Sequence, residues 1–114
     1  PTCSNQEDHV SMASNAGRHA RPVVANIDAV VATELWMAAQ ALALRLAEQG
    51  RVAEARAPAP RAAVDVLRAT PATDGRPIDH LTRDVVLYPR VHAALDLVRS
   101  GAVVAAADKA TYTP

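Results

Sequence analysis

Residues 23–49 read VVANIDAVVATELWMAAQALALRLAEQ, and this stretch decides the fold. Its apolar residues recur at steps of three and four, the spacing that keeps side chains on one face of an α-helix. One stripe contains Val24, Ile27, Val31, Leu35, Ala38, Leu42 and Leu46. A second stripe beside it contains Val23, Val30, Met37, Ala41 and Leu44. Gly50 is a typical helix stop, so the pattern predicts one helix over about 23–49, roughly 40 Å long at 1.5 Å per residue.

A helix that is apolar on two broad faces has to be covered on both. The chain has 114 residues with no Phe, one Trp and two Tyr, so it lacks the bulky side chains of an independent core. We therefore expect this helix to lie in a bundle whose other members belong to further polypeptide. Trp36 is expected to pack. Glu34 and Gln40 are expected to form internal hydrogen bonds, and Asn26 and Asp28 to satisfy neighbouring helices.

The polar residues before this helix contain capping patterns. Ser4 and Glu7 have the spacing of a capping box, and Asp8 is a second candidate cap. A helix is therefore predicted to start between residues 5 and 9. Pro22 removes one backbone donor, so we expect a kink or a break near residues 18–22.

The segment after Gly50 is rich in Pro, Ala and Arg. Residues 57–60 alternate Ala and Pro, which predicts a stiff, extended connector. A short helix is predicted over about 61–69, because Thr70 and Pro71 end the apolar pattern there. Asp74 and Gly75 predict a turn.

The last part of the chain contains one more helical pattern. Residues 81–88 are predicted to be a loop with a helical turn, and residues 89–100 a helix that Gly101 ends. The alanine-rich tail, residues 102–114, is expected to be loosely held. No stretch shows a strand–helix–strand pattern, so the predicted fold class is all-α.

Composition excludes several partners. Twelve basic and twelve acidic residues cancel, and they are scattered, whereas a nucleic-acid surface needs a clustered basic face. The most apolar window, residues 29–44, contains Glu34 and is shorter than the ~20 residues of a membrane span. We expect neither a nucleic-acid nor a membrane partner. The single cysteine, Cys3, has no internal partner for a disulfide.

The densest group of ionisable side chains is Gln6-Glu7-Asp8-His9. Helix capping is the commoner use of such a pattern, and binding of a small ligand is the alternative that the residues leave open. The four histidines lack the spacing of a zinc site, so no metal site is predicted. Cys3 and His9 lack the third group that a nucleophile and base need, and no glycine-rich phosphate loop is present.

The run Ser4-Asn5-Gln6-Glu7-Asp8-His9-Val10-Ser11-Met12 resembles a motif of the histidine ammonia-lyase family, which belongs to the aromatic amino-acid ammonia-lyases and aminomutases. The resemblance continues through Ala16-Gly17-Arg18, Asn26, Glu34, Ala39-Gln40-Ala41-Leu42 and Leu44-Arg45. It resumes at Leu87-Tyr88-Pro89 and at Leu97-Val98-Arg99-Ser100-Gly101-Ala102.

This resemblance implies a cytoplasmic homotetramer whose long antiparallel helices form a central bundle, with active sites built from several identical subunits. It also implies non-oxidative loss of ammonia from an amino-acid substrate, with a 4-methylideneimidazole-5-one group formed from an internal Ala-Ser-Gly. Residues 13–15 and 99–101 do not match Ala-Ser-Gly. Residues 1–114 are therefore expected to be the carboxyl-terminal helical segment of a longer chain, without activity of their own.

The resemblance gives Glu7 the catalytic position, in contact with the substrate side chain, and places Gln6 beside it in the pocket wall. Relatives that act on phenylalanine or tyrosine tend to carry Gln where Glu7 stands, so Glu7 favours histidine. A tyrosine or phenylalanine ammonia-lyase, or a 2,3-aminomutase, is the alternative within the family. A small helical interaction module without catalysis is the alternative of another class.

Overall fold

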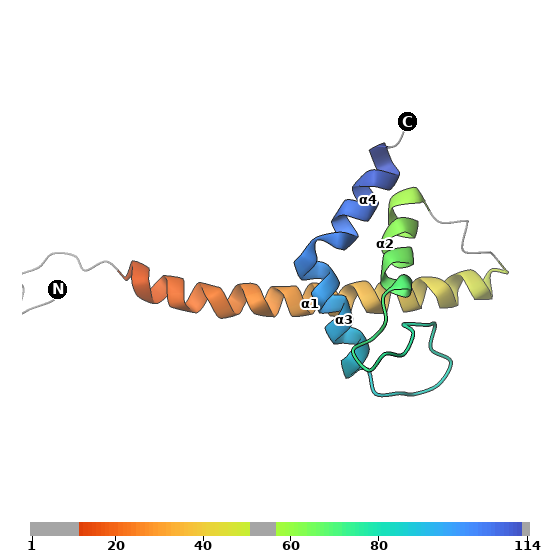
Figure 1. The fold of residues 1–114 in the computed structure, drawn as a ribbon, viewed down its shortest axis with the longest axis horizontal. Helices are drawn as coiled ribbons and strands as arrows, with labels where there is room; N and C mark the ends of the chain where they lie inside the picture. The colour runs from red at the N-terminus through yellow and green to blue at the C-terminus, as the bar shows by residue number, and fades with distance from the viewer. Residues whose placement is uncertain (1–11, 51–56, 113–114) are drawn as a thin grey trace, which may run out of the picture.

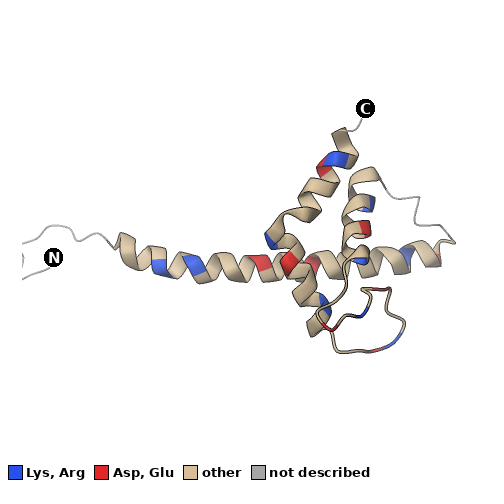
Figure 2. Cartoon of the chain, viewed as in Figure 1, with Lys and Arg blue, Asp and Glu red and all other residues tan. Residues whose placement is uncertain are grey.

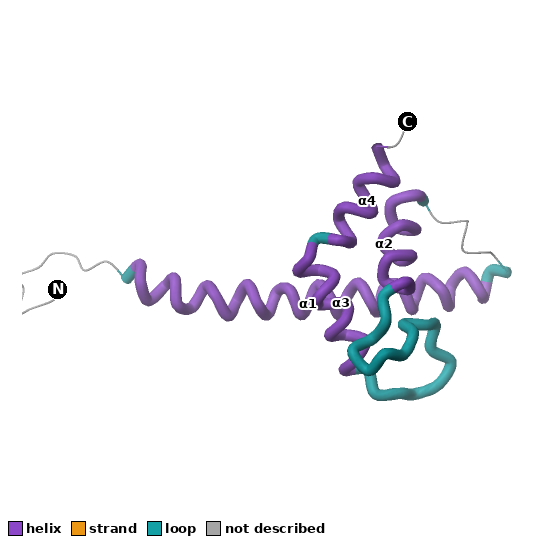
Figure 3. Tube along the Cα trace, viewed as in Figure 1, coloured by secondary structure: helices purple, strands orange, loops and turns teal. Residues whose placement is uncertain are grey.

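The computed structural model describes residues 12–50 and 57–112. Its regular elements are four α-helices: α1 (Ala13–Glu48), α2 (Pro58–Ala69), α3 (Tyr88–Ser100) and α4 (Ala102–Tyr112) (Figure 1). The loop between α2 and α3 contains one isolated bridge, between Pro71 and Pro77. Figure 3 shows helix and loop without a strand in this described part, so the predicted all-α class is confirmed.

The three shorter helices gather over the carboxyl half of α1, whose amino half extends away from them (Figure 1). Helix α3 packs against α1, α2 packs against α4, and α3 also meets α4 beyond the turn at Gly101. Gly101 has a φ of 73°, a left-handed conformation in which a side chain would be strained.

Small side chains dominate the core where α1 and α3 cross. Ala32 and Ala39 on α1 and Ala93 and Ala94 on α3 are buried, which lets the two backbones approach closely. Trp36 is only 4% exposed, so its predicted packing role is confirmed. The other buried members of this cluster come from α2 and the following loop: Val64, Leu67, Ala72 and Ile78.

The buried face of α1 differs from both predicted stripes. It contains Ala32, Trp36, Ala39 and Leu46, and only Leu46 belongs to a stripe. Seven large stripe residues are instead 42–64% exposed: Val23, Val24, Ile27, Val30, Val31, Met37 and Leu44. Residues 12–50 and 57–112 thus leave both predicted stripes of α1 largely uncovered, as expected.

The predicted interruption of α1 at Pro22 is wrong, because the helix is continuous from Ala13 to Glu48 (Figure 1). Pro22 leaves the carbonyl of Arg18 without its helical donor, but both residues are exposed, so water can bind that carbonyl. Helix α1 begins at Ala13, before the predicted start near residue 23. The helix start predicted between residues 5 and 9 lies outside the described residues. The capping residues Ser4, Glu7 and Asp8 lie outside the described residues.

Three predictions for the second half of the chain need correction. Helix α2 begins at Pro58, within the predicted extended connector, because a proline in the first turn loses no helical hydrogen bond. The tail is not loose: residues 102–112 form α4, since alanine has the highest helix propensity. Residues 81–87 form a loop as predicted, without the expected helical turn.

The turn at Asp74 and Gly75 is confirmed by a hydrogen bond of 2.8 Å from Gly75 N to Ala72 O.

Candidate functional site

Both predicted site residues, Gln6 and Glu7, lie outside the described residues. The structure nevertheless shows the helix to which they lead. Ala13, the first residue of α1, comes six positions after Glu7, and residues 12–27 are all exposed. Helix α1 begins at the end of the described chain that is nearest in sequence to the candidate site, and its first turns project from the packed body (Figure 1).

Gln40 joins α1 to the loop before α3 through both ends of its amide. Its Nε2 donates to the carbonyl oxygen of Leu81 at 2.8 Å, and its Oε1 accepts from the Leu81 backbone N–H at 3.0 Å. The predicted internal hydrogen bonding of Gln40 is thus confirmed. Because one side chain satisfies both backbone groups of Leu81, it fixes the path of the loop across α1.

Two further contacts tie α1 and α2 to the segments that follow them. Arg99 on α3 donates from Nε to Asp28 Oδ2 on α1 at 3.3 Å, which confirms that Asp28 serves a neighbouring helix. Arg68 on α2 donates from Nη1 to the Ile78 carbonyl at 2.7 Å. Together with the amide of Gln40, these bonds join α1 to α3 and join the loop after α2 to both α1 and α2.

Glu34 and Asn26 are both exposed in the described chain. The internal hydrogen bond predicted for Glu34 is not formed among the described residues, and the contact of Asn26 with a neighbouring helix stays a prediction. Glu34 lies in a shallow surface hollow on α1 that Ala29, Val30, Thr33 and Met37 also line. Its carboxylate is therefore surrounded by exposed apolar side chains rather than by polar partners.

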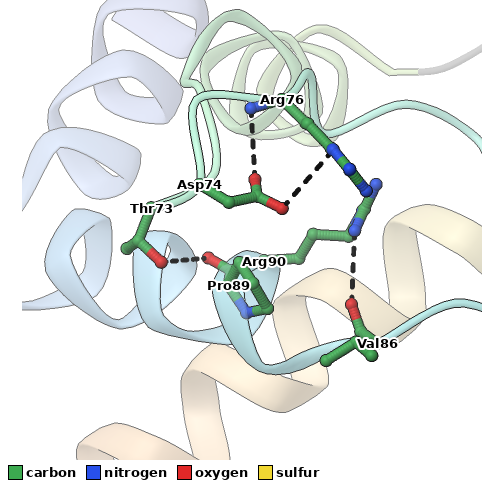
Figure 4. A network of polar contacts seen from close by, with 6 residues as sticks. All are labelled: Thr73, Asp74, Arg76, Val86, Pro89 and Arg90. Atoms are coloured by element: carbon green, nitrogen blue, oxygen red, sulfur yellow. Dashed lines mark hydrogen bonds and ion pairs between the residues drawn. The ribbon is translucent and has the colours of Figure 1, made fainter.

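A polar network at the start of α3 was not predicted from the sequence (Figure 4). The Pro89 carbonyl accepts from Thr73 N at 3.2 Å and from Thr73 Oγ1 at 3.5 Å. Asp74 accepts from Arg76 N at 3.1 Å and forms an ion pair of 3.8 Å with Arg76 Nε. Arg90 is only 7% exposed. A Pro-Arg pair at a helix start gives no sequence signal for such burial.

The described histidines do not form a metal centre. Among residues 12–50 and 57–112, no three His, Cys, Asp or Glu side chains lie close enough to share an ion. His92 packs against the ring of Tyr88, with centroids 4.0 Å apart. His9 and Cys3 lie outside the described part.

Charge is spread over the described helices rather than gathered on one face (Figure 2). By length and composition alone α1 is also long and apolar enough to cross a membrane, a criterion that core helices of soluble proteins meet as well.

Comparison with known proteins gives a consistent result. A family model described as aromatic amino acid lyase matches residues 1–69. The chain is 43% identical over 108 residues to the histidine ammonia-lyase of Symbiobacterium thermophilum, covering 95% of this chain and 19% of that protein. It is 40% identical over 111 residues to the histidine ammonia-lyase of Streptomyces griseus, covering 97% of this chain and 20% of that protein.

A third relative, histidine ammonia-lyase 1 of Fusobacterium nucleatum, is 34% identical over 110 residues, covering 96% of this chain and 19% of that protein. The chain thus spans about a fifth of the length of these curated relatives. No solved structure matches it.

Proposed function

This chain belongs to the aromatic amino acid lyase family, and from that membership we propose that it is the carboxyl-terminal segment of a longer histidine ammonia-lyase. The complete enzyme removes ammonia from histidine without oxidation and gives an α,β-unsaturated acid such as urocanate. The observation that carries the proposal is the similarity of nearly the whole chain to proteins named histidine ammonia-lyase. An interaction module of another class gains no support from these relatives.

Glu7 is the proposed catalytic residue, in contact with the substrate side chain, and Gln6 is proposed to line the pocket beside it. A carboxylate accepts a charge-strengthened hydrogen bond from an imidazole N–H and can hold a proton there. Next to a phenyl or phenol ring the same carboxylate would lose hydration without a matching donor, which is unfavourable. Glu7 therefore supports histidine over phenylalanine or tyrosine as the substrate.

The family resemblance implies a 4-methylideneimidazole-5-one group, but the described residues do not fit as its source. Ser14 lies in the exposed first turn of α1, and Ser100 donates to the Leu97 carbonyl at the end of α3. Neither serine stands in an Ala-Ser-Gly. We propose that the group forms in a part of the enzyme outside this chain. The role argued for Glu7 is confined to the substrate side chain.

The exposed apolar stripes of α1 support a proposal about assembly. We propose that the rest of the enzyme and identical subunits cover them in a cytoplasmic homotetramer. Lipid is the less favourable cover, because Asp28 and Glu34 would then lie inside a membrane span. The same stripes are too apolar to remain in water over so long a helix.

The test is the replacement Glu7→Ala in the complete enzyme. Loss of the carboxylate removes the hydrogen bond to the imidazole, so turnover of histidine should fall by about 10²–10⁴-fold. The rise in ultraviolet absorbance of the conjugated product measures the rate. Size-exclusion chromatography should show an unchanged assembly.

Glu48→Ala is the matched control, because Glu48 is an exposed carboxylate at the other end of α1. This variant should retain wild-type turnover. Wild-type activity in Glu7→Ala would refute the assigned role. Faster turnover of tyrosine or phenylalanine than of histidine by the unmodified enzyme, or a β-amino acid product, would instead support the alternatives within the family.

A further inference from the structure

Within residues 12–50 and 57–112, Arg90 is a buried cation without a counter-charge. It is only 7% exposed, and its Nε is buried with no hydrogen-bond partner. Its one side-chain hydrogen bond among the described residues runs from Nη1 to the Val86 carbonyl, at a long 3.3 Å. A guanidinium carries five N–H donors and is always charged, so burying it with one weak acceptor is strongly unfavourable.

The position of Arg90 in α3 makes burial of its positive charge still less favourable. It is the third residue of the helix, where the helix dipole already contributes positive potential, and the first turn contains no acidic residue. The nearby carboxylate, Asp74, is engaged by the backbone and side chain of Arg76. Figure 4 shows Asp74 joined to Arg76 and not to Arg90, whose one drawn contact is with the Val86 carbonyl.

An exposed apolar segment lies directly beside this cation. Val86 is 76% exposed, Leu87 38% and Tyr88 64%, and they immediately precede Arg90 and its neighbour Pro89. Three consecutive exposed apolar residues next to a buried, unpaired charge are typical of a surface that another polypeptide segment covers.

We propose that Arg90 receives the carboxylate of an Asp or Glu side chain from a segment of the same enzyme outside these 114 residues, and that this segment covers Val86, Leu87 and Tyr88. The inference rests on the proposed function in one respect: the chain must be part of a longer lyase. A carboxylate matches the planar fork of a guanidinium through two parallel hydrogen bonds. The curated relatives, of which this chain spans about a fifth, contain ample further polypeptide to supply it.

The first test is an experimental structure of the complete enzyme. A carboxylate oxygen should lie within hydrogen-bond distance of Arg90 Nε or Nη, on a segment that also contacts Tyr88. Water or main-chain carbonyls alone around the Arg90 guanidinium would overturn the proposal.

The second test uses thermal unfolding of the complete enzyme. Arg90→Met should lower the unfolding midpoint by several degrees, because it strands the partner carboxylate. Arg61→Met is the matched control: the side chain of Arg61 is 48% exposed and pairs with Asp65 one turn along α2, so its midpoint should change by about one degree or less.

A double variant distinguishes a pair from simple packing. Replacing the carboxylate found in the structure by its amide should lower the midpoint on its own but add little to Arg90→Met. Additive shifts would overturn the pairing. If inorganic phosphate raises the midpoint of the wild type but not of Arg90→Met, the site holds a dissolved anion and the proposed polypeptide partner is wrong.

These outcomes are separable from the proposed function. An enzyme that shows the Arg90–carboxylate pair but does not turn over histidine would refute the proposed substrate only. An enzyme active on histidine without the pair would refute the docking site only.

Discussion

At the scale of single residues, the side-chain amide of Gln40 joins the loop before α3 to α1. Gln40 satisfies both backbone groups of Leu81, and Leu81 packs against the buried core cluster. If the backbone N–H and C=O of Leu81 had no hydrogen-bond partners, each would destabilise the fold by about 1–3 kcal/mol. The position of residues 81–87 therefore depends on the length and the neutral charge of the side chain at position 40.

Gln40→Ala should release this loop without unfolding the chain. We expect a loss of about 2 kcal/mol in local stability, which corresponds to about 30-fold faster hydrogen exchange at the Leu81 amide. Mass-spectrometric exchange on the complete enzyme measures it. Gln49→Ala is the control, because Gln49 is exposed beyond the end of α1. Equal exchange in both variants would show that other contacts hold the loop.

Among single side chains, the sequence predicts the burial of some correctly and of others not. Gln40 and Trp36 were correctly predicted to face inward because a helix between apolar stripes has few other places for them. The same prediction for Glu34 differs from the structure, where Glu34 is exposed on the outer side of α1. Burial of Arg90 depends on how the loop from Thr73 to Leu87 folds back over α3, and periodicity contains no information on that path.

At the scale of elements, helices with a clear stop were predicted within a few residues. Gly50 and Gly101 mark the ends of α1 and α3 as expected. Proline is a correct helix stop at Pro71, after the end of α2, but the breaks expected from Pro22 and Pro58 are wrong. In α2 the prolines occupy the first turn, where the missing donor costs nothing, and in α1 the freed carbonyl faces solvent. The buried face of α1 follows Trp36 and three other residues because α3 offers a surface of alanines there.

Pro22→Ala tests whether the proline weakens the projecting half of α1. Alanine restores the donor to the Arg18 carbonyl and is about 3 kcal/mol more favourable than proline inside a helix. Amides of residues 18–26 should therefore exchange more slowly in the complete enzyme.

Pro58→Ala is the matched control, because the backbone nitrogen at the first position of α2 has no helical acceptor. It should leave exchange in α2 almost unchanged. If Pro22→Ala speeds exchange, the proline instead fits a bend that the complete enzyme requires.

At the scale of the whole molecule, the described chain is an incomplete body. It is elongated, 72 × 40 × 26 Å, and its longest helix projects from the rest, with residues 13–27 all exposed (Figure 1). The sequence anticipated this from the two-faced pattern of α1 and the lack of aromatic residues. It did not reveal how the carboxyl half of α1 is covered, because α3 packs there through small buried alanines that leave only a weak periodic signal.

Val30→Asp tests whether further polypeptide covers the outer stripe of α1. Val30 is 64% exposed in this chain and lies beside the Glu34 hollow, so it is expected to become buried in the complete assembly. An unpaired carboxylate at that position would lose its hydration, which costs several kcal/mol in each subunit and opposes association. Size-exclusion chromatography with light scattering should show smaller species than the wild type forms. Val30→Ala, which remains apolar, should still assemble. A Val30→Asp enzyme with wild-type mass and an unchanged unfolding midpoint would mean that this face remains in water, and the bundle arrangement proposed for α1 would be wrong.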